Sequence, residues 1–307
     1  MVDVVRLGVF SPSAVVAVGT DAGSFESAGI ALEISAVRSS VSAFTDLASG
    51  ALDLLVTSPD NVLAYRLNRS NVLGSRIDAQ ILLGIDRGLG LSLMAAPDGN
   101  DRVEGVGGRQ LLGVDAPATG FAYAAYALMD RLGLAKHGLD IVELGATPLR
   151  RDALTAGACS LTMLNAGHDL LAENAGCRRV ARVVETLGPY LGSALVGLQS
   201  WASEHKSLLD RFADTWLEST RMVVEPASVA AVTLRIKRLL GCDEATASRA
   251  VETLVSRTEG LVVDGRIDEA ELQTVIELRA ARGGFDGEAI PRAAAAVETG
   301  LVRERPG

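Results

Sequence analysis

Hydroxyl, amide and imidazole groups recur in four short loops of the sequence, each directly after an apolar run that predicts a strand. In folds of alternating strands and helices, ligands bind at the carboxyl ends of the strands, where the following helices turn free N–H groups outward. Small polar side chains at that edge therefore predict hydrogen bonding to a ligand. The ligand-binding candidates are Phe10, Ser11, Ser13, Thr57, Ser58, Thr119, Gly120, Tyr123, Asn165 and His168, with Tyr190 from a later segment.

The first loop, 10–13 (FSPS), joins two hydroxyls to an aromatic ring. Ser11 and Ser13 suit an oxygen of a carboxylate, sulfonate or phosphate, and the Phe10 ring suits an apolar face of a ligand. The alternative is a tight turn whose serines cap the next helix.

The second loop, 57–61 (TSPDN), follows the predicted strand 52–56. Thr57 and Ser58 are expected to reach a ligand. Asp60 or Asn61 is expected to cap the helix that follows, because these side chains accept hydrogen bonds from the first free N–H groups of a helix.

The third loop, 115–120 (DAPATG), provides the strongest candidate for an anion site. Thr119 and Gly120 open a helix whose exposed N–H groups can bind an anion, and a glycine lets the backbone approach the ligand closely. Tyr123, one turn further on, is expected to line the same cleft. Simple helix capping is the alternative.

The fourth loop, 164–169 (LNAGHD), contains Asn165, which offers a donor and an acceptor. It also contains His168, and a lone histidine is more often structural than catalytic. If the chain is an enzyme, His168 is a catalytic candidate together with Asp86 and Arg87, which follow the predicted strand 80–85.

Two further segments carry residues that suit a ligand or a hinge. Arg87 in the first segment can reach an anionic ligand or form a salt bridge at a hinge. Tyr190 lies in the second segment between Gly188 and Gly192, and these glycines would absorb a hinge rotation.

Composition limits the classes of partner and cofactor. The 307 residues carry a net charge of −9, so neither nucleic acid nor an anionic membrane surface is an expected partner. Only 4% of the residues are aromatic, which predicts an aliphatic core. The three cysteines include no C-x-x-C pair, so neither disulfides nor a metal site is expected. No cofactor is expected either.

Localisation is predicted from the absence of targeting features. No apolar run approaches the roughly 18 residues that cross a bilayer, and the N-terminus lacks a basic region followed by a long apolar one. As written, the sequence predicts a cytoplasmic protein. If a leader was removed, a periplasmic or cell-surface location is expected.

The remaining pattern predicts two sets of alternating strands and helices, followed by a helical tail. Strands are expected at 4–10, 29–34, 52–56, 80–85 and 91–95 in the first set, and at 111–115, 141–144, 160–164 and 178–184 in the second. One more strand begins near residue 195. Helices are expected at 204–224, 229–240, 245–257 and 268–279, packed back on the first set.

Several segments resemble the substrate-binding proteins of nitrate, taurine, alkanesulfonate and thiamine-pyrimidine ABC importers. The opening strand with its FSPS turn is similar, and further similar segments are 47–54 (LASGALDL), 108–114 (GRQLLGV), 117–120 (PATG), 151–157 (RDALTAG) and 278–286 (LRAARGGFD). The resemblance implies an α/β fold of two lobes, of the periplasmic-binding-protein type II, with two mixed sheets and a ligand cleft between them. It implies a first lobe at 1–90 and 190–307, a second lobe at 91–189, and an ABC permease as a partner.

Three functions remain open at this point. The first is binding of a small organic anion or heterocycle by hinge closure, without catalysis. The second is a cytosolic enzyme on the same scaffold, a cofactor-independent decarboxylase or lyase acting on an aromatic or sulfur-containing acid, because the scaffold also hosts enzymes. The third is a ligand-gated sensor that contacts another protein through its acidic helical tail.

Overall fold

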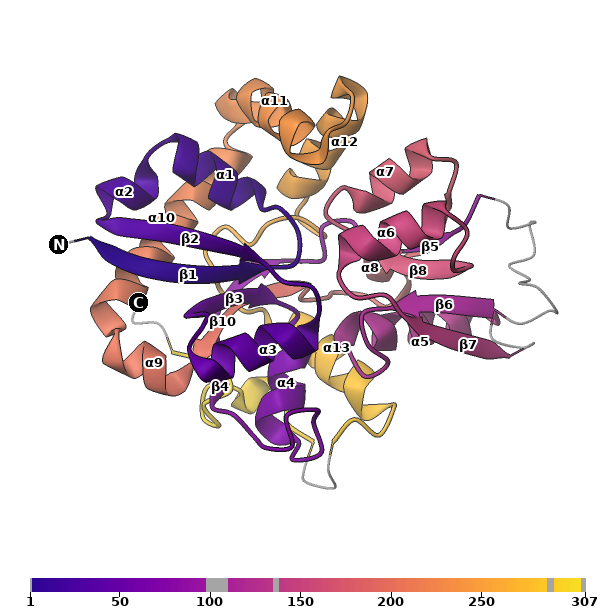
Figure 1. The fold of residues 1–307 in the computed structure, drawn as a ribbon, viewed down its shortest axis with the longest axis horizontal. Coiled ribbons are helices and arrows are strands. Elements are labelled where there is room, and N and C mark those ends of the chain that lie inside the picture. The colour runs from indigo at the N-terminus through magenta and orange to yellow at the C-terminus, as the bar shows by residue number, and fades with distance from the viewer. Residues whose placement is uncertain (1, 98–109, 135–137, 286–289, 305–307) are drawn as a thin grey trace.

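The computed structural model describes residues 2–97, 110–134, 138–285 and 290–304, and its core is two five-stranded sheets side by side (Figure 1). Gly108, Arg109 and Asp286, from two of the segments that carry the family resemblance, lie outside the described residues. Among the described residues, no helix combines the length and the apolar character needed to cross a membrane.

The sheet of the first lobe has the strand order β2-β1-β3-β10-β4. β10 runs antiparallel to both of its neighbours, whereas β1 is parallel to β2 and β3. All eight residues of β4 are buried, as expected for an inner layer covered on both faces. The strands are β1 (Asp3–Val9), β2 (Ile30–Ala36), β3 (Leu54–Thr57), β4 (Ala79–Asp86) and β10 (Ser193–Leu198).

The sheet of the second lobe has the order β7-β6-β8-β5-β9. β6 is parallel to β7 and β8, and β5 is antiparallel to β8 and β9. The two sheets therefore repeat one topology, with a single antiparallel strand next to the edge. The strands are β5 (Ser92–Ala95), β6 (Gln110–Val114), β7 (Leu139–Glu143), β8 (Leu161–Leu164) and β9 (Arg178–Arg182).

Helices cover the faces of both sheets (Figure 1). The first lobe carries α1 (Ala14–Asp21), α2 (Ser24–Ser27), α3 (Ser40–Ser49), α4 (Pro59–Leu67), α9 (Gln199–Glu204) and α10 (Lys206–Val224). The second lobe carries α5 (Gly120–Leu132), α6 (Thr147–Thr155), α7 (His168–Asn174) and α8 (Val183–Thr186). Most strands and helices agree with the sequence patterns, because apolar periodicity reports which face each element buries. The strand expected at 178–184 instead ends at Arg182, where α8 begins, and α9 was not expected.

The chain passes between the sheets twice, after β4 and before β10, and the two connections touch. A Cβ added to Gly192 would lie 2.2 Å from the Gly88 backbone nitrogen, so only glycine fits there. Three consecutive residues of the first connection have a left-handed backbone: Gly88 (φ 106°), Leu89 (φ 49°) and Gly90 (φ 77°). The expected lobe limits, 90/91 and 189/190, fall inside these connections.

The tail helices α11 (Val229–Leu240), α12 (Glu244–Val255) and α13 (Glu269–Ala280) contact both lobes. α11 packs on α1 and α13 packs on α4, as the sequence predicts for the first lobe. However, α12 also contacts α7 and α13 also contacts α5, both in the second lobe. Figure 1 shows α11 and α12 above the space between α1 and α7. The tail therefore packs on the first lobe, as expected, and α12 and α13 add contacts to the second lobe.

A buried ion pair fastens α13 to the junction of the lobes. Arg279 Nε and Nη2 lie 2.6 and 2.7 Å from the two carboxylate oxygens of Asp60 in α4. Nη2 also donates to the backbone oxygen of Ala118 at 3.0 Å, and the guanidinium lies 5.0 Å from the centre of the Tyr123 ring. One arginine thus joins both lobes to the tail.

Asp60→Ala is predicted to reduce the free energy of unfolding by about 3–5 kcal/mol, because it leaves the buried guanidinium without its counter-charge. Urea denaturation at neutral pH measures this. The control is Lys206→Ala, which removes the exposed Lys206–Asp210 pair and should cost less than about 1 kcal/mol. Equal losses in the two variants would contradict the role given to the buried pair.

Candidate functional site

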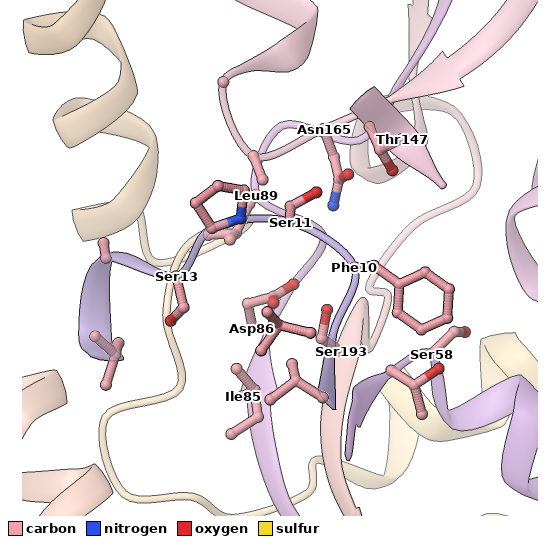
Figure 2. Close-up of a pocket in the computed structure, with 18 of the residues that line it drawn as sticks. Phe10, Ser11, Ser13, Ser58, Ile85, Asp86, Leu89, Thr147, Asn165 and Ser193 are labelled. Carbon is pink, nitrogen blue, oxygen red and sulfur yellow. The ribbon is translucent and has the colours of Figure 1, made fainter. Parts of the chain in front are cut away.

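A cavity of about 150 Å³ lies between the lobes at the carboxyl ends of the strands (Figure 2). The four loops selected in the sequence all contribute to its wall. Of the predicted site residues, those that line it are Phe10, Ser11, Ser13, Thr57, Ser58, Asp86, Thr119, Gly120 and Asn165. Loops far apart in the sequence meet there because strand ends of both sheets face the same space.

The N-termini of α4 and α5 meet at one end of this cavity. Ser58 is the N-cap residue of α4 and Thr119 that of α5, and neither side chain caps its own helix. A Cβ added to Gly120 would lie 2.7 Å from both Ser58 Oγ and Asp60 Cβ, so the lobes are in contact at this point. At the start of α4, Pro59 has no N–H group and the Asn61 N–H donates to the Ser58 backbone oxygen at 3.0 Å. The free N–H groups that provide a positive potential for an anion therefore belong mainly to α5.

The prediction that Asp60 or Asn61 caps α4 is wrong, because the N-cap residue is Ser58. The helix begins at Pro59, so Asp60 and Asn61 lie inside the first turn instead of before it. Asp60 pairs with Arg279, and Asn61 Nδ2 donates to Thr57 Oγ1 at 2.8 Å. Thr57 therefore keeps a fixed orientation at the cavity wall.

The loop after β1 crosses the cavity, and one of its hydroxyls is already used. Ser13 Oγ accepts from the Val16 N–H at 3.3 Å and so caps α1, which is the alternative that the sequence left open. Figure 2 shows Ser11 on the side of the cavity where Asn165 lies, and Phe10 beside Ser58. Ser11 and Phe10 are the members of this loop whose side chains remain for a ligand.

Arg150 provides a positive charge that the sequence analysis missed. It lines the cavity from α6, is 2% exposed, and forms no ion pair with a carboxylate of the described residues. Its donors bind the backbone oxygens of Met163 and Gly145 (2.6 Å to the latter) and Thr147 Oγ1 (3.0 Å). Burial lowers the pKa of Arg150 to about 10, which still leaves it charged at neutral pH.

Two carboxylates also line the cavity. Asp86 Oδ1 accepts from the Gly88 N–H at 2.8 Å, and burial raises the pKa of Asp86 to about 6. Asp115 Oδ2 accepts from the Ser40 N–H at 3.2 Å. Its other oxygen, Oδ1, is buried without a hydrogen-bond partner among the described residues, and so is Ser58 Oγ. A buried acceptor left unpaired is costly, so the site favours a ligand with a donor for Asp115.

The first connection between the lobes is bonded to the loop after β8. Asn165 Nδ2 donates to the Gly88 backbone oxygen at 3.1 Å, and the Ala166 N–H donates to the Leu89 oxygen at 2.8 Å. Leu89 and Ala166 are the described non-glycine residues with a positive φ, 49° and 53°. Such strain persists only where surrounding structure imposes it, and here both strained residues line the cavity.

Tyr123 and Tyr190 lie outside the cavity wall, which corrects their predicted placement. Tyr123 turns toward Arg279 of α13, because the first turn of α5 packs on that helix. Tyr190 is 1% exposed, and burial raises its pKa. The nearby Ser58 hydroxyl partly opposes this rise in pKa. Neither the Tyr190 hydroxyl nor the Ser58 hydroxyl has a hydrogen-bond partner among the described residues.

His168 and Arg87, two of the three catalytic candidates, are likewise absent from the wall of this cavity. Arg87 Nε donates to Glu271 Oε1 at 2.5 Å, so it forms the hinge salt bridge that was its alternative. His168 Nδ1 lies 3.1 Å from Arg151 Nη1. Burial, and then the Arg151 charge, lowers the pKa of His168 to about 4. Of the described residues that line the cavity, none is a histidine or a cysteine.

The tail contributes a wall that the sequence analysis did not anticipate. Its residues in the lining are Ile236, Leu239, Leu240, Ala250, Thr253, Leu254 and Leu261. Amphipathic periodicity identified their helices, but no sequence signal distinguishes an apolar residue facing the core from one facing a cavity. Arg150 could have been found from Thr147, since the strand-to-helix loop that ends there belongs to the same class as the four selected loops.

Comparisons with known proteins bear on the fold. No protein-family model and no curated protein matches the chain. The nitrate-binding protein NrtA from Synechocystis PCC 6803 has a TM-score of 0.74 at 10% identity, over 98% of this chain and 86% of that chain. The alkanesulfonate-binding protein SsuA from Xanthomonas axonopodis pv. citri, bound to MOPS, has a TM-score of 0.68 at 14% identity, over 94% and 95%.

A Candida albicans gene product with the generic periplasmic binding protein fold has a TM-score of 0.73 at 11% identity, over 100% of this chain and 99% of that chain. The two-lobe α/β fold of periplasmic binding proteins, which the sequence resemblance predicts, is thereby confirmed. Because these identities are low, the likeness establishes the fold alone, and the nature of the ligand must be inferred from the residues of the cavity.

Asp86→Asn is predicted to stabilise the protein at alkaline pH. Because the folded state raises the pKa from 3.8 to about 6, ionisation of Asp86 destabilises the fold as pH rises through that interval, and the penalty stays constant above it. The variant should exceed the wild type by up to about 3 kcal/mol in unfolding free energy at pH 8, with the difference lost below pH ~4.

Urea denaturation across pH measures this difference. Glu26→Gln, an exposed carboxylate in α2, is the control and should change stability little at any pH. A gain of Asp86→Asn that is independent of pH would show that burial of the charge is not its cause.

Proposed function

We propose that this protein binds a small organic anion, aliphatic or heterocyclic, in the cavity between its lobes, and that the bound ligand holds the lobes closed. The observation that carries the proposal is the buried Arg150 guanidinium at a cavity wall, without an ion pair among the described residues, beside two uncapped helix N-termini. The hydrogen bonds of Arg150 go to neutral oxygens, and the Asp115 charge acts on it without forming an ion pair. An anionic ligand would therefore supply a direct counter-charge.

The remaining polar groups define the rest of the ligand's polar end. The unpaired Asp115 Oδ1 and the raised pKa of Asp86 favour a ligand that carries an N–H or O–H donor as well as its anionic oxygens. Ser58 and Ser11 can donate to those oxygens, whereas the Thr119 hydroxyl already donates to the Ala116 backbone oxygen at 2.9 Å. The protein's net charge of −9 does not oppose this, because local donors and helix N-termini dominate at short range.

The volume of the cavity limits the size of the ligand. A cavity of about 150 Å³ in an engineered protein accommodates benzene. The cavity here has about the same volume, which supports a ligand with one ring or a short chain in addition to its polar group. Nitrate and short alkanesulfonates, the classes of anion named for two of the similar structures, are small enough to fit within this volume.

Closure would occur by rotation at the two connections, with residues 1–90 and 190–307 moving as one lobe and 91–189 as the other. The glycines at 88, 90, 188 and 192 would absorb the rotation. The ligand favours the closed state only to the extent that it contacts both lobes. The cavity wall supports this, since Ser58 comes from one lobe and Arg150 from the other. If the bound anion is imported, an ABC permease would be the partner, and the protein would act outside the cytoplasm.

Binding is tested by thermal denaturation with millimolar propanoate, benzoate, methanesulfonate, taurine and orotate. An anion that binds should raise the melting temperature by mass action. At a concentration one hundred times its Kd, it should add about 2.7 kcal/mol to the free energy of unfolding. Gly120→Ala should weaken the affinity roughly 10-fold or more, because the added methyl group separates the lobes where they meet.

The control is Gly157→Ala, a position with φ 70° where an added Cβ meets nothing within 4 Å. Alanine is strained there, so the stability should fall while the affinity stays unchanged. If no anion of the panel raises the melting temperature of the wild type, the proposed function is wrong. If Gly120→Ala binds as tightly as Gly157→Ala, closure is not part of binding.

A further inference from the structure

The cavity extends from its polar end into an apolar end formed by the tail helices. α11 contributes Ile236, Leu239 and Leu240, and α12 contributes Ala250, Thr253 and Leu254. None of the residues of α11 and α12 that line the cavity is charged. The facing wall continues the apolar character with Val15, Ile85 and Leu89.

The one hydroxyl on this wall is already bonded to its own helix. Thr253 Oγ1 donates to the Arg249 backbone oxygen at 3.2 Å. Its methyl carbon Cγ2 lies toward the first connection, 3.5 Å from where a Cβ of Gly90 would be. Water entering this end would therefore find few partners, and an apolar group is the favoured occupant.

Contacts from the tail to the second lobe enclose the apolar end. A Cβ added to Gly167 would lie 2.5 Å from Leu240 Cδ1, so these two residues are in direct contact. Asn174 Nδ2 donates to Thr246 Oγ1 at 2.7 Å, and Arg249 pairs with Glu173 at 2.7 Å. A group held at this end is thus removed from water by both lobes and the tail together.

We infer that the ligand is amphipathic, and that an apolar body of about six carbons lies against α11 and α12 while its anionic group lies at the polar end. This inference rests on the proposed function and adds a selectivity to it. The tail helices then set which anions bind, because each methylene group buried among these side chains raises the affinity about fourfold.

The experiment compares the Kd values of propanoate, butanoate, hexanoate and octanoate by isothermal titration calorimetry. The wild type should gain affinity with each methylene group up to about hexanoate and then level off. In Ala250→Leu, the larger side chain fills the apolar end, so this gain should be lost while propanoate binds as in the wild type.

Ala245→Leu makes the same substitution at an exposed position of α12 and should keep the gain. A second pair of variants, one of which enlarges the apolar end and one of which is its control, tests the opposite change. Leu239→Ala should weaken the affinity for hexanoate about 10-fold and leave the affinity for propanoate unchanged. Leu234→Ala, at an exposed position of α11, should leave both affinities unchanged.

The possible failures are distinguishable. If propanoate binds as tightly as hexanoate to the wild type, or if Ala250→Leu and Ala245→Leu behave alike, the apolar subsite is wrong and the proposed anion binding stands. If none of the four carboxylates binds and no other anion raises the melting temperature, both proposals are wrong.

Discussion

The cavity depends on one close contact between the lobes, where Gly120 at the start of α5 lies against Ser58 and Asp60 of α4. Only a residue without a side chain lets the two helix N-termini approach so closely. Beneath them, Arg279 bonds to Asp60 of the first lobe and to the Ala118 backbone oxygen of the second. The same contact thus closes the cavity and aligns two uncapped helix ends toward its interior.

Burial determines the electrostatics of the enclosed space. Removal from water raises the pKa of Asp86 and lowers that of Arg150, so each charge there is costly unless something pairs with it. The protein satisfies Arg150 with carbonyl oxygens and a hydroxyl, which fix its position without neutralising its charge. Asp115 retains one oxygen with no partner among the described residues. The arrangement is therefore unfavourable when empty of ligand and becomes favourable when a polar group occupies it.

The backbone is strained at two positions near the hinge. Leu89 and Ala166 hold left-handed conformations that their side chains disfavour, and a hydrogen bond joins them across the cavity wall. Asn165 adds a second bond to the same connection. Movement of either lobe would alter these bonds, so the position of the lobes and the shape of the cavity are coupled.

The sequence by itself determined the elements, their order and the loops that form the polar wall, because apolar periodicity and strand-end polarity are local properties. It placed Ser58, Thr119 and Asn165 at the cavity for this reason. Only the tertiary structure decided which side chains turn inward. Tyr123 faces Arg279 instead of the cavity, and Ala250 joins a wall from far along the chain. Such outcomes depend on packing between segments that are distant in sequence, and periodicity within one segment carries no information about its neighbours in space.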